Sequence, residues 1–243
     1  RGILKEPERP LIFAMSRLDS IKNITGFIKW YSKNKNIRES ANVLVIGGKI
    51  DSEGSNDEEE KEQIDLMHSL FDKYDLSESV RWVGLQMDKK FVGEIYRFIA
   101  DRKGVFIQPA TFEAFGLTVI EAMISGLPTF ATCYGGPLEI IKHGESGFHI
   151  DPNKGDETMK LIADFLNAVK DDTAEWDRIS KGGIERVESQ YTWKLYANRL
   201  MRLSRIYGFW KYVSNLEREE TQRYLEMFYT LMYRRIAEKV PTL

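Results

Sequence analysis

The first 150 residues of the chain alternate between short apolar runs and longer segments of mixed polarity. The apolar runs are rich in Val, Ile and Phe and do not alternate strictly with polar residues, which indicates strands covered on both faces. Six strands are predicted, at residues 10–15, 43–48, 80–84, 104–108, 128–132 and 148–150. Because segments with helical spacing lie between them, the pattern predicts an α/β fold with a Rossmann-like doubly wound parallel sheet of about six strands.

The segments between the strands carry helix signals at their ends. Five helices are predicted, at residues 24–31, 58–74, 92–100, 117–125 and 138–142. Asn23 is expected to be the N-cap of the first helix, and Pro137 stands at the N1 position of the last. The acidic run 57–62 is interpreted as a solvated helix start and not as a binding site, because the helix dipole favours acids there.

The pattern changes after Pro152, where helical spacing replaces the strands. Four C-terminal helices are predicted, at residues 156–169, 172–189, 193–207 and 217–238. We therefore divide the chain into a Rossmann-like core, 1–152, and C-terminal helices, 153–243, that complete it. The last helix carries an apolar stripe that would pack on its own sheet, on a missing domain or on another subunit. The stripe consists of Tyr224, Leu225, Phe228, Leu231 and Met232.

Composition and charge exclude several classes of protein. The chain has 243 residues, with 35 Lys and Arg against 37 Asp and Glu, so its net charge of −2 gives no basic field for nucleic acid or an anionic membrane. No segment approaches the length of a membrane span. The single cysteine, Cys133, fits a reducing compartment, and we expect a cytoplasmic protein. The three histidines show no metal-ligand spacing, so no metal site is expected.

The strongest chemical signal lies where a predicted strand, a turn and a helix meet near residue 113. Glu113 precedes the turn, Gly116 stands just before the helix, and Glu121 follows Glu113 by eight positions. A helix N-terminus offers unpaired N–H groups to a phosphate, and glycine allows close approach. The two carboxylates would accept hydrogen bonds from sugar hydroxyls. The segment therefore predicts a sugar-nucleotide site; the alternative is two solvated glutamates beside an ordinary turn.

Other notable residues also follow predicted strands. Arg17 and Lys22 follow the first strand, Gly47-Gly48 the second, Gln86 the third and Gly135-Gly136 the fifth. Ligands of doubly wound sheets bind at the carboxyl ends of the strands. This agreement favours the ligand site over the ordinary turn.

Several segments resemble the sucrose synthases, which are retaining glycosyltransferases of the GT-B fold. Glu113 and Glu121 are separated by seven residues, as in the E-x7-E segment of retaining GT-B enzymes, and loop 16–23 resembles their Arg…Lys phosphate loop. Segments 129–137, 146–152, 207–217 and 223–229 resemble the sucrose synthases more specifically. The resemblance covers essentially the whole chain but only the carboxyl-terminal half of a sucrose synthase. It therefore implies one half of a GT-B fold.

This resemblance implies a reaction and its partners. The reaction is the reversible, retaining and metal-independent conversion of NDP-glucose and D-fructose to NDP and sucrose, with UDP-glucose or ADP-glucose as the donor. The chain would bind the nucleoside diphosphate and glucose side, without any cofactor. It would be inactive without its own N-terminal GT-B domain. The full-length protein would be a homo-oligomer, a tetramer in this family.

The resemblance also assigns roles to the residues that contact the sugar and the phosphates. Arg17 and Lys22 would hold the diphosphate and balance the charge that develops on the leaving group, work that a divalent metal does elsewhere. Glu113 would hold the hydroxyls of the donor glucose and orient its ring. Phe115 and Gly116 would contact the sugar through the backbone. Arg17, Lys22 and Glu113 are thus the catalytic candidates.

The nucleotide contacts implied by the resemblance come from other loops. Glu121 would bind the ribose hydroxyls, and Gln86 would lie near the base. Leu117 and Thr118 would offer backbone N–H groups, and Gly48 would border the nucleotide.

One position departs from the family pattern and concerns the base. Plant sucrose synthases carry an asparagine six residues after the glutamine that matches Gln86, whereas this chain has Val92. Valine can neither donate to nor accept from a uracil edge. Relaxed nucleotide choice is therefore expected.

Two other interpretations remain open. The chain could be part of a sucrose-phosphate synthase or a starch or glycogen-type glucosyltransferase, although segments 209–210 and 224–229 argue against this. It could also be a non-catalytic nucleotide-binding or oligomerisation module built around its last helix.

Overall fold

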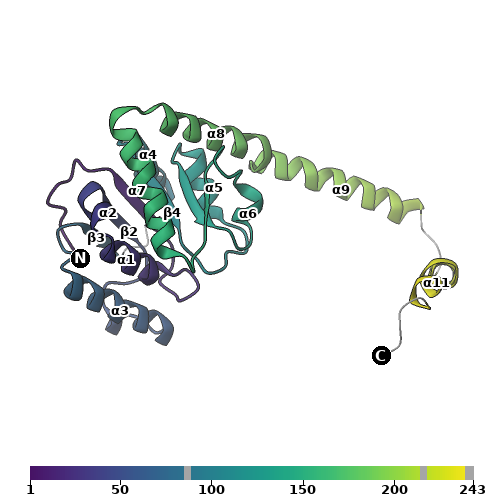
Figure 1. Ribbon diagram of the computed structural model, residues 1–243. Coiled ribbons are helices and arrows are strands. Elements are labelled where there is room, and N and C mark those ends of the chain that lie inside the picture. The colour runs from purple at the N-terminus through teal and green to yellow at the C-terminus, as the bar shows by residue number, and fades with distance from the viewer. Residues whose placement is uncertain (85–88, 214–217, 239–243) are drawn as a thin grey trace. The chain divides into compact units, whose positions relative to one another are not determined.

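The computed structural model describes residues 1–84, 89–213 and 218–238. It divides into two compact units, Arg1–Tyr191 and Thr192–Leu243, which are described separately. The first unit is an α/β domain, and the second consists of helices (Figure 1).

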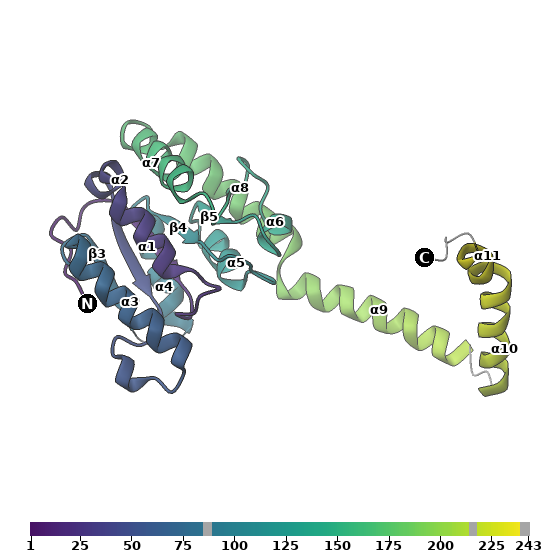
Figure 2. The same ribbon diagram turned by 60° about the horizontal axis from the view of Figure 1, so that its bottom comes forward.

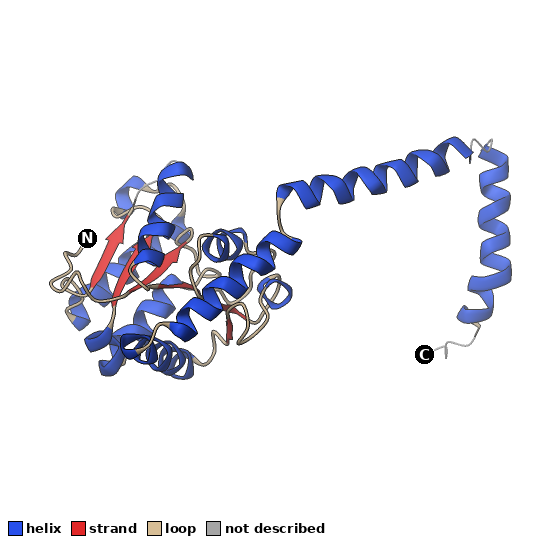
Figure 3. Cartoon of the chain, turned by 90° about the horizontal axis from the view of Figure 1, so that it is seen from above, coloured by secondary structure: helices blue, strands red, loops and turns tan. Residues whose placement is uncertain are grey.

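The first unit is built on one parallel sheet of six strands, which confirms the predicted fold class. Its strands are β1 (Leu11–Met15), β2 (Asn42–Ile46), β3 (Val80–Val83), β4 (Val105–Gln108), β5 (Thr129–Thr132) and β6 (Phe148–Ile150). They lie in the order β3-β2-β1-β4-β5-β6, and every pair is parallel. Figure 3 shows the strands in red, surrounded by the helices of the first unit. This is the strand order of a doubly wound domain.

Helices cover both faces of the sheet. Those of the first unit are α1 (Ile24–Lys33), α2 (Lys35–Ser40), α3 (Glu58–Tyr74), α4 (Lys89–Asp101), α5 (Leu117–Ile124), α6 (Pro137–Ile140), α7 (Gly155–Asp171) and α8 (Ala174–Gln190), with a 3-10 turn η1 (Ser52–Gly54). Helix α1 contacts α3 and α7, while α5 contacts α4 and α8 (Figure 2). Because parallel strands are joined by right-handed crossovers, reversing the direction of strand addition after β3 places α4 and α5 on the face opposite α1 and α3.

Aromatic side chains fix α4 over the middle of the sheet. Phe13 of β1, Tyr96 of α4 and Phe106 of β4 form a cluster of edge-to-face pairs with ring centroids 5.3–5.7 Å apart. All three side chains are fully buried. Such pairs add about 0.5–1.5 kcal/mol each beyond the burial of their apolar area. They hold α4 beside the two strands where the order of the sheet reverses.

That reversal creates the place where ligands of doubly wound sheets bind. The chain adds β2 and β3 on one side of β1 and then places β4 on the other side. The loops that leave β1 and β4 therefore diverge from neighbouring strand ends. In domains of this class the crevice between two such loops accepts the ligand.

The expected helix signals had different outcomes. Pro137 occupies N1 of α6, as predicted. Asn23 stands at the N-cap position of α1, as predicted, but its φ is 54° and its side chain makes no capping hydrogen bond. Its Nδ2 instead donates to the carbonyl oxygen of Pro109, 3.0 Å away, and so joins the β1 loop to the β4 loop.

The second unit contains the helices that follow Tyr191. They are α9 (Trp193–Val213), α10 (Arg218–Phe228) and α11 (Arg234–Ala237), with a π-helical turn η2 (Tyr229–Tyr233) between the last two. The single helix expected at 217–238 is thus interrupted by a wider turn. Its predicted apolar stripe is exposed, with Phe228 at 46% and Leu225 at 59%. The partner of this stripe, expected to be its own sheet, a missing domain or another subunit, stays a prediction. The helices α7 and α8, also predicted after Pro152, belong to the same unit as the sheet.

Candidate functional site

A cavity of about 990 Å³ opens at the carboxyl ends of β1, β2 and β3. Three predicted site residues line it: Arg17 after β1, Gly48 after β2 and Glu121 on α5. Val92, the position expected to face the base, lines it from α4.

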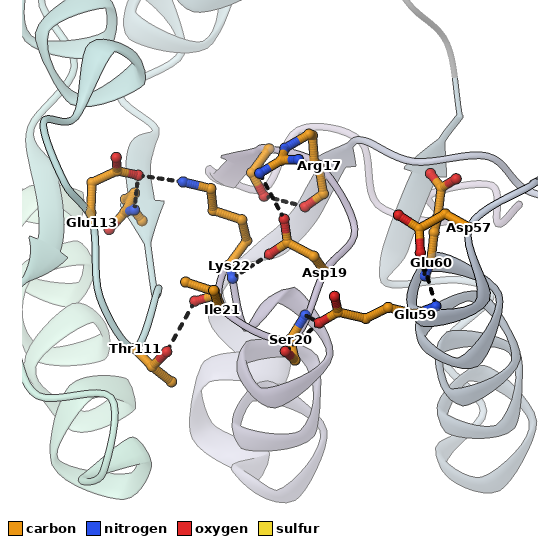
Figure 4. A network of polar contacts seen from close by, with 12 residues as sticks. Arg17, Asp19, Ser20, Ile21, Lys22, Asp57, Glu59, Glu60, Thr111 and Glu113 are labelled. Atoms are coloured by element: carbon orange, nitrogen blue, oxygen red, sulfur yellow. Dashed lines mark hydrogen bonds and ion pairs between the residues drawn. The ribbon is translucent and has the colours of Figure 1, made fainter.

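Outside the lining of this cavity, an ion pair joins the loops after β1 and β4. Lys22 Nζ lies 2.7 Å from Glu113 Oε2, and the two side chains are only 21% and 14% exposed (Figure 4). Backbone contact supports the same junction, because Thr111 N–H donates to the carbonyl oxygen of Ile21 at 2.8 Å. The structure therefore brings together two predicted catalytic residues that are separated by 91 positions in the sequence.

Glu113 receives hydrogen bonds from three different parts of the domain. Lys22 Nζ and Gln108 Nε2 both donate to Oε2, at 2.7 and 2.8 Å, while the Phe115 N–H approaches Oε1 at 3.4 Å. The carboxylate is thus held in one orientation before any ligand binds. Gln108 was missed by the sequence analysis. The sequence signal that could have indicated it is a single amide side chain at the end of the otherwise apolar strand β4.

Arg17 is held much more loosely than Lys22. Its side chain is 84% exposed and pairs with Asp19 Oδ2 at 3.2 Å. The other oxygen of Asp19 accepts the backbone N–H of Lys22 at 2.8 Å, which braces the loop. Exposed pairs of this kind contribute about 0–1 kcal/mol. The guanidinium of Arg17 can therefore move to an anionic ligand at little cost.

The acidic run 57–62 forms the expected helix start but also contacts the candidate site. Helix α3 begins at Glu58, and Asp57 Oδ1 accepts the N–H groups of Glu59 and Glu60, at 3.0 and 3.4 Å. Glu59 Oε1 accepts both the hydroxyl and the backbone N–H of Ser20, in the loop that carries Lys22 (Figure 4). These hydrogen bonds hold the pKa of the Glu59 carboxyl below its ordinary value. The prediction of a helix start is thus confirmed, whereas the prediction that the whole run is solvated does not hold for Glu59.

The turn before α5 is pressed against a glycine pair. Glu113 N–H donates to the carbonyl oxygen of Tyr134 at 3.1 Å, and Gly136 N–H donates to that of Glu113 at 2.7 Å. A Cβ on Gly135 would stand 2.0 Å from the Glu113 carbonyl oxygen, and one on Gly136 would stand 2.1 Å from that of Phe115. Backbone contact this close requires glycine at both positions.

Glu121 lies in the cavity beside a buried tyrosine. Burial raises the pKa of the Tyr96 hydroxyl, and the nearby Glu121 carboxylate raises it further. Both residues line the cavity, from α4 and α5. The predicted contact of Glu121 with ribose hydroxyls is compatible with this place but stays a prediction.

The remaining predicted residues lie around the start of α5. Gly116 has a φ of 103° immediately before the helix, which only glycine adopts readily. Leu117 and Thr118 form the first turn, and the side chain of Phe115 is half-exposed. Gln86, expected near the base, lies outside the described residues.

The described residues contain neither a cluster of metal ligands nor a membrane-spanning helix. No group of three or more His, Cys, Asp or Glu side chains within residues 1–84, 89–213 and 218–238 could hold a metal ion. In that same part of the chain, no helix is long and apolar enough to cross a membrane.

Comparison with known proteins defines the class. Residues 1–181 match the family model described as glycosyl transferases group 1, so the chain belongs to the group 1 glycosyltransferases. Among curated proteins it is 60% identical to a sucrose synthase of Nitrosomonas europaea and 58% identical to one of Denitrovibrio acetiphilus. These matches cover 99% and 98% of this chain but 30% of each relative. The chain thus spans about a third of the length of these relatives.

Solved structures confirm the fold as one half of a GT-B glycosyltransferase. A sucrose-phosphate synthase from Thermosynechococcus elongatus matches with a TM-score of 0.65 and 25% identity, over 81% of this chain and 45% of that chain. Anabaena Alr3699/HepE in complex with UDP and glucose matches with a TM-score of 0.66 and 18% identity, over 81% and 48%. The latter likeness concerns the fold alone.

Proposed function

We propose that the chain is the donor-binding part of a sucrose synthase and that its site binds a nucleoside diphosphate and its glucose. The observation that carries this proposal is the pair between Lys22 and Glu113, which joins the β4 loop to the β1 loop, whose Arg17 lines the cavity. A cation for phosphate and an acid for sugar hydroxyls stand next to each other there, as transfer of glucose from a nucleoside diphosphate requires. The identity of 58–60% to sucrose synthases supports this substrate class.

In the proposed reaction the two cations of the β1 loop act on the leaving group. When the bond between the anomeric carbon and the phosphate oxygen breaks, negative charge grows on the diphosphate. Lys22 would supply a localised positive charge, and Arg17 a planar guanidinium that can donate two hydrogen bonds. Both stabilise the negative charge on the diphosphate. Glu113 would hold the glucose hydroxyls and fix the ring relative to the bond that breaks. No cofactor beyond the nucleotide sugar is required.

The proposal extends to partners and location. The chain matches 30% of each sucrose synthase relative. We assign acceptor binding to an N-terminal GT-B domain, which lies in the other part of those relatives. The exposed apolar stripe of α10 and η2 favours contact with that domain or with another copy in a homo-oligomer. We expect the protein in the cytoplasm.

A hybrid enzyme tests the proposed reaction. The N-terminal part of the Nitrosomonas europaea sucrose synthase, fused to this chain in place of its own matching 30%, should convert NDP-glucose and fructose to sucrose. Fructose 6-phosphate in place of fructose should give no product. Turnover of fructose 6-phosphate in preference to fructose would instead identify a sucrose-phosphate synthase, the class of the structural neighbour from Thermosynechococcus elongatus.

The chain by itself should bind the nucleotide without making sucrose. Closure of two domains over the donor excludes water and positions the acceptor, and this chain forms only one of them. Calorimetric titration with ADP and UDP should therefore give binding, while an assay with NDP-glucose and fructose should give no measurable sucrose. Robust synthesis by residues 1–243 alone would contradict this expectation.

Val92 should relax the choice of base. Its half-buried side chain lines the cavity and packs against the core, and it offers the base apolar contact only. A pocket that does not hydrogen-bond a base has little means of rejecting another one. ADP should bind at least as tightly as UDP, and Val92→Asn should shift the balance toward UDP.

The matched control is Val92→Ala, which removes apolar contact without adding an amide and should weaken both nucleotides alike. A tenfold preference of the unchanged chain for UDP, about 1.4 kcal/mol, would count against this role of Val92.

A further inference from the structure

A buried amide lies behind the candidate catalytic pair. Gln108 is the last residue of β4, and its side chain is only 3% exposed. Its Nε2 donates to Glu113 Oε2 at 2.8 Å, the same oxygen that Lys22 Nζ contacts. The opposite amide orientation would bring its oxygen against that carboxylate oxygen, so the observed orientation is the one that electrostatics favours.

The other end of this amide is unsatisfied. Gln108 Oε1 is buried and has no hydrogen-bond partner among the described residues. A buried acceptor without a partner destabilises a fold, and an apolar side chain at this position would avoid that cost. The amide therefore has a reason other than stability, and the one side-chain hydrogen bond that it makes within the described part of the chain is with Glu113.

The position of Lys22 shows when this contact matters. In the structure, Lys22 and Gln108 share Glu113 Oε2. If Lys22 contacts a diphosphate, as the proposed function requires, its hold on the carboxylate weakens. Gln108 then remains as the side-chain donor to Oε2. Because the amide is neutral, it orients the carboxylate without reducing its negative charge, which a second cation would do.

We propose that Gln108 is a positioning residue that keeps Glu113 in place to receive the donor sugar while Lys22 holds the diphosphate. This inference rests on the proposed function and adds to it the residue that keeps recognition of the sugar separate from recognition of the phosphates. Gln108 acts through Glu113. Its loss should affect a ligand that carries glucose and spare one that ends in phosphate.

The experiment compares two dissociation constants measured by calorimetry on the 243-residue chain. The ratio of the constant for NDP-glucose to that for NDP reports on the sugar contact alone. Gln108→Met keeps the approximate size of the side chain and removes the donor, and it should raise this ratio about tenfold. The matched control Gln63→Met removes a glutamine that accepts from Thr25 Oγ1 between α1 and α3, and it should leave the ratio unchanged.

A second variant separates positioning from simple packing. In Gln108→Glu two carboxylates face each other, so at pH 8 they repel, whereas at lower pH they share a proton whose O–H replaces the amide donor. The ratio should therefore be raised at pH 8 and fall toward that of the unchanged chain as the pH approaches 5.5. Of the nearby charged groups, Glu113 contacts Gln108, and Lys22 contacts Glu113. Arg17 and Asp19 lie in the β1 loop, and Glu59 is hydrogen-bonded to it. The same ratio of dissociation constants, measured for the unchanged chain and for Gln108→Met over the same pH range, shows how much of the pH dependence comes from these other groups.

Each outcome decides the inference. An unchanged ratio in Gln108→Met, or equal weakening of both ligands, would overturn it and leave the proposed function standing. Binding of NDP without any binding of NDP-glucose by the unchanged chain would overturn it as well, since Glu113 would then hold no sugar. If the unchanged chain binds neither ligand, the proposed function fails first.

Discussion

Replacing Lys22 by alanine should weaken binding of a nucleoside diphosphate by about 10- to 150-fold, and binding of the matching nucleoside hardly at all. A hydrogen bond to a charged group contributes about 1.5–3 kcal/mol, which corresponds to that range. The ammonium group is largely buried and fixed by Glu113, so little entropy is lost when it meets a phosphate. Arg17→Ala should act in the same direction, with a smaller effect because the guanidinium is 84% exposed and screened by solvent.

Titration of both variants with ADP and adenosine measures the effect directly. Lys29→Ala is a suitable control, since it removes an equal charge from an exposed position on α1. It should change neither constant appreciably. Equal losses for ADP and adenosine in Lys22→Ala would show that the loop shapes the pocket as a whole and does not bind the diphosphate.

Gly136→Ala should destabilise the domain and disrupt the sugar side of the site. Gly136 has a φ of −54° and a ψ of −40°, which alanine adopts easily, so the penalty is purely steric. The added Cβ would lie 2.1 Å from the Phe115 carbonyl oxygen, and the turn that carries Glu113 would have to move. Overpacking of this kind costs about 1–3 kcal/mol. We expect a loss of that size in the free energy of unfolding and a larger loss of affinity for NDP-glucose than for NDP.

Denaturant unfolding and calorimetry of the same variant provide the test. Gly208→Ala is the control, because its Cβ would have nothing within 4 Å and helical alanine is favoured over glycine. It should leave stability unchanged or raise it slightly. A Gly136→Ala variant with unchanged stability and unchanged binding would mean that the turn moves freely and does not fix Glu113.

The candidate site lies at the edge of the sheet that the sequence pattern predicts. The sequence places Lys22 after one buried strand and Glu113 after another, and the doubly wound pattern puts both at the carboxyl edge of the sheet. Their direct contact does not follow from that pattern. It depends on β4 lying next to β1, which is decided when the chain crosses the sheet after β3.

Contacts between loops account for the other differences. Asn23 has the side chain of a common N-cap, yet it bonds to the carbonyl oxygen of Pro109, because a left-handed backbone and a neighbouring loop offer a different partner. Glu59 belongs to an ordinary acidic helix start, yet it accepts two hydrogen bonds from Ser20 because α3 and the β1 loop lie side by side. Sequence patterns record local preferences and burial, and neither specifies which loop faces which.

The sequence by itself determined the class of fold, the six strands, most of the helices, and the edge of the sheet where Arg17, Lys22, Glu113 and Glu121 would gather, since hydrophobic periodicity and turn chemistry are local properties. Only the tertiary structure decided that Lys22 and Gln108 share one oxygen of Glu113 and that a glycine pair supports the turn beneath it. The contacts of Lys22 and of the glycine pair join segments that are distant in the chain, whereas Gln108 lies only 5 positions before Glu113 and reaches it through the fold of the β4 loop. Their geometry arises from strand order and packing, which no local pattern of residues encodes.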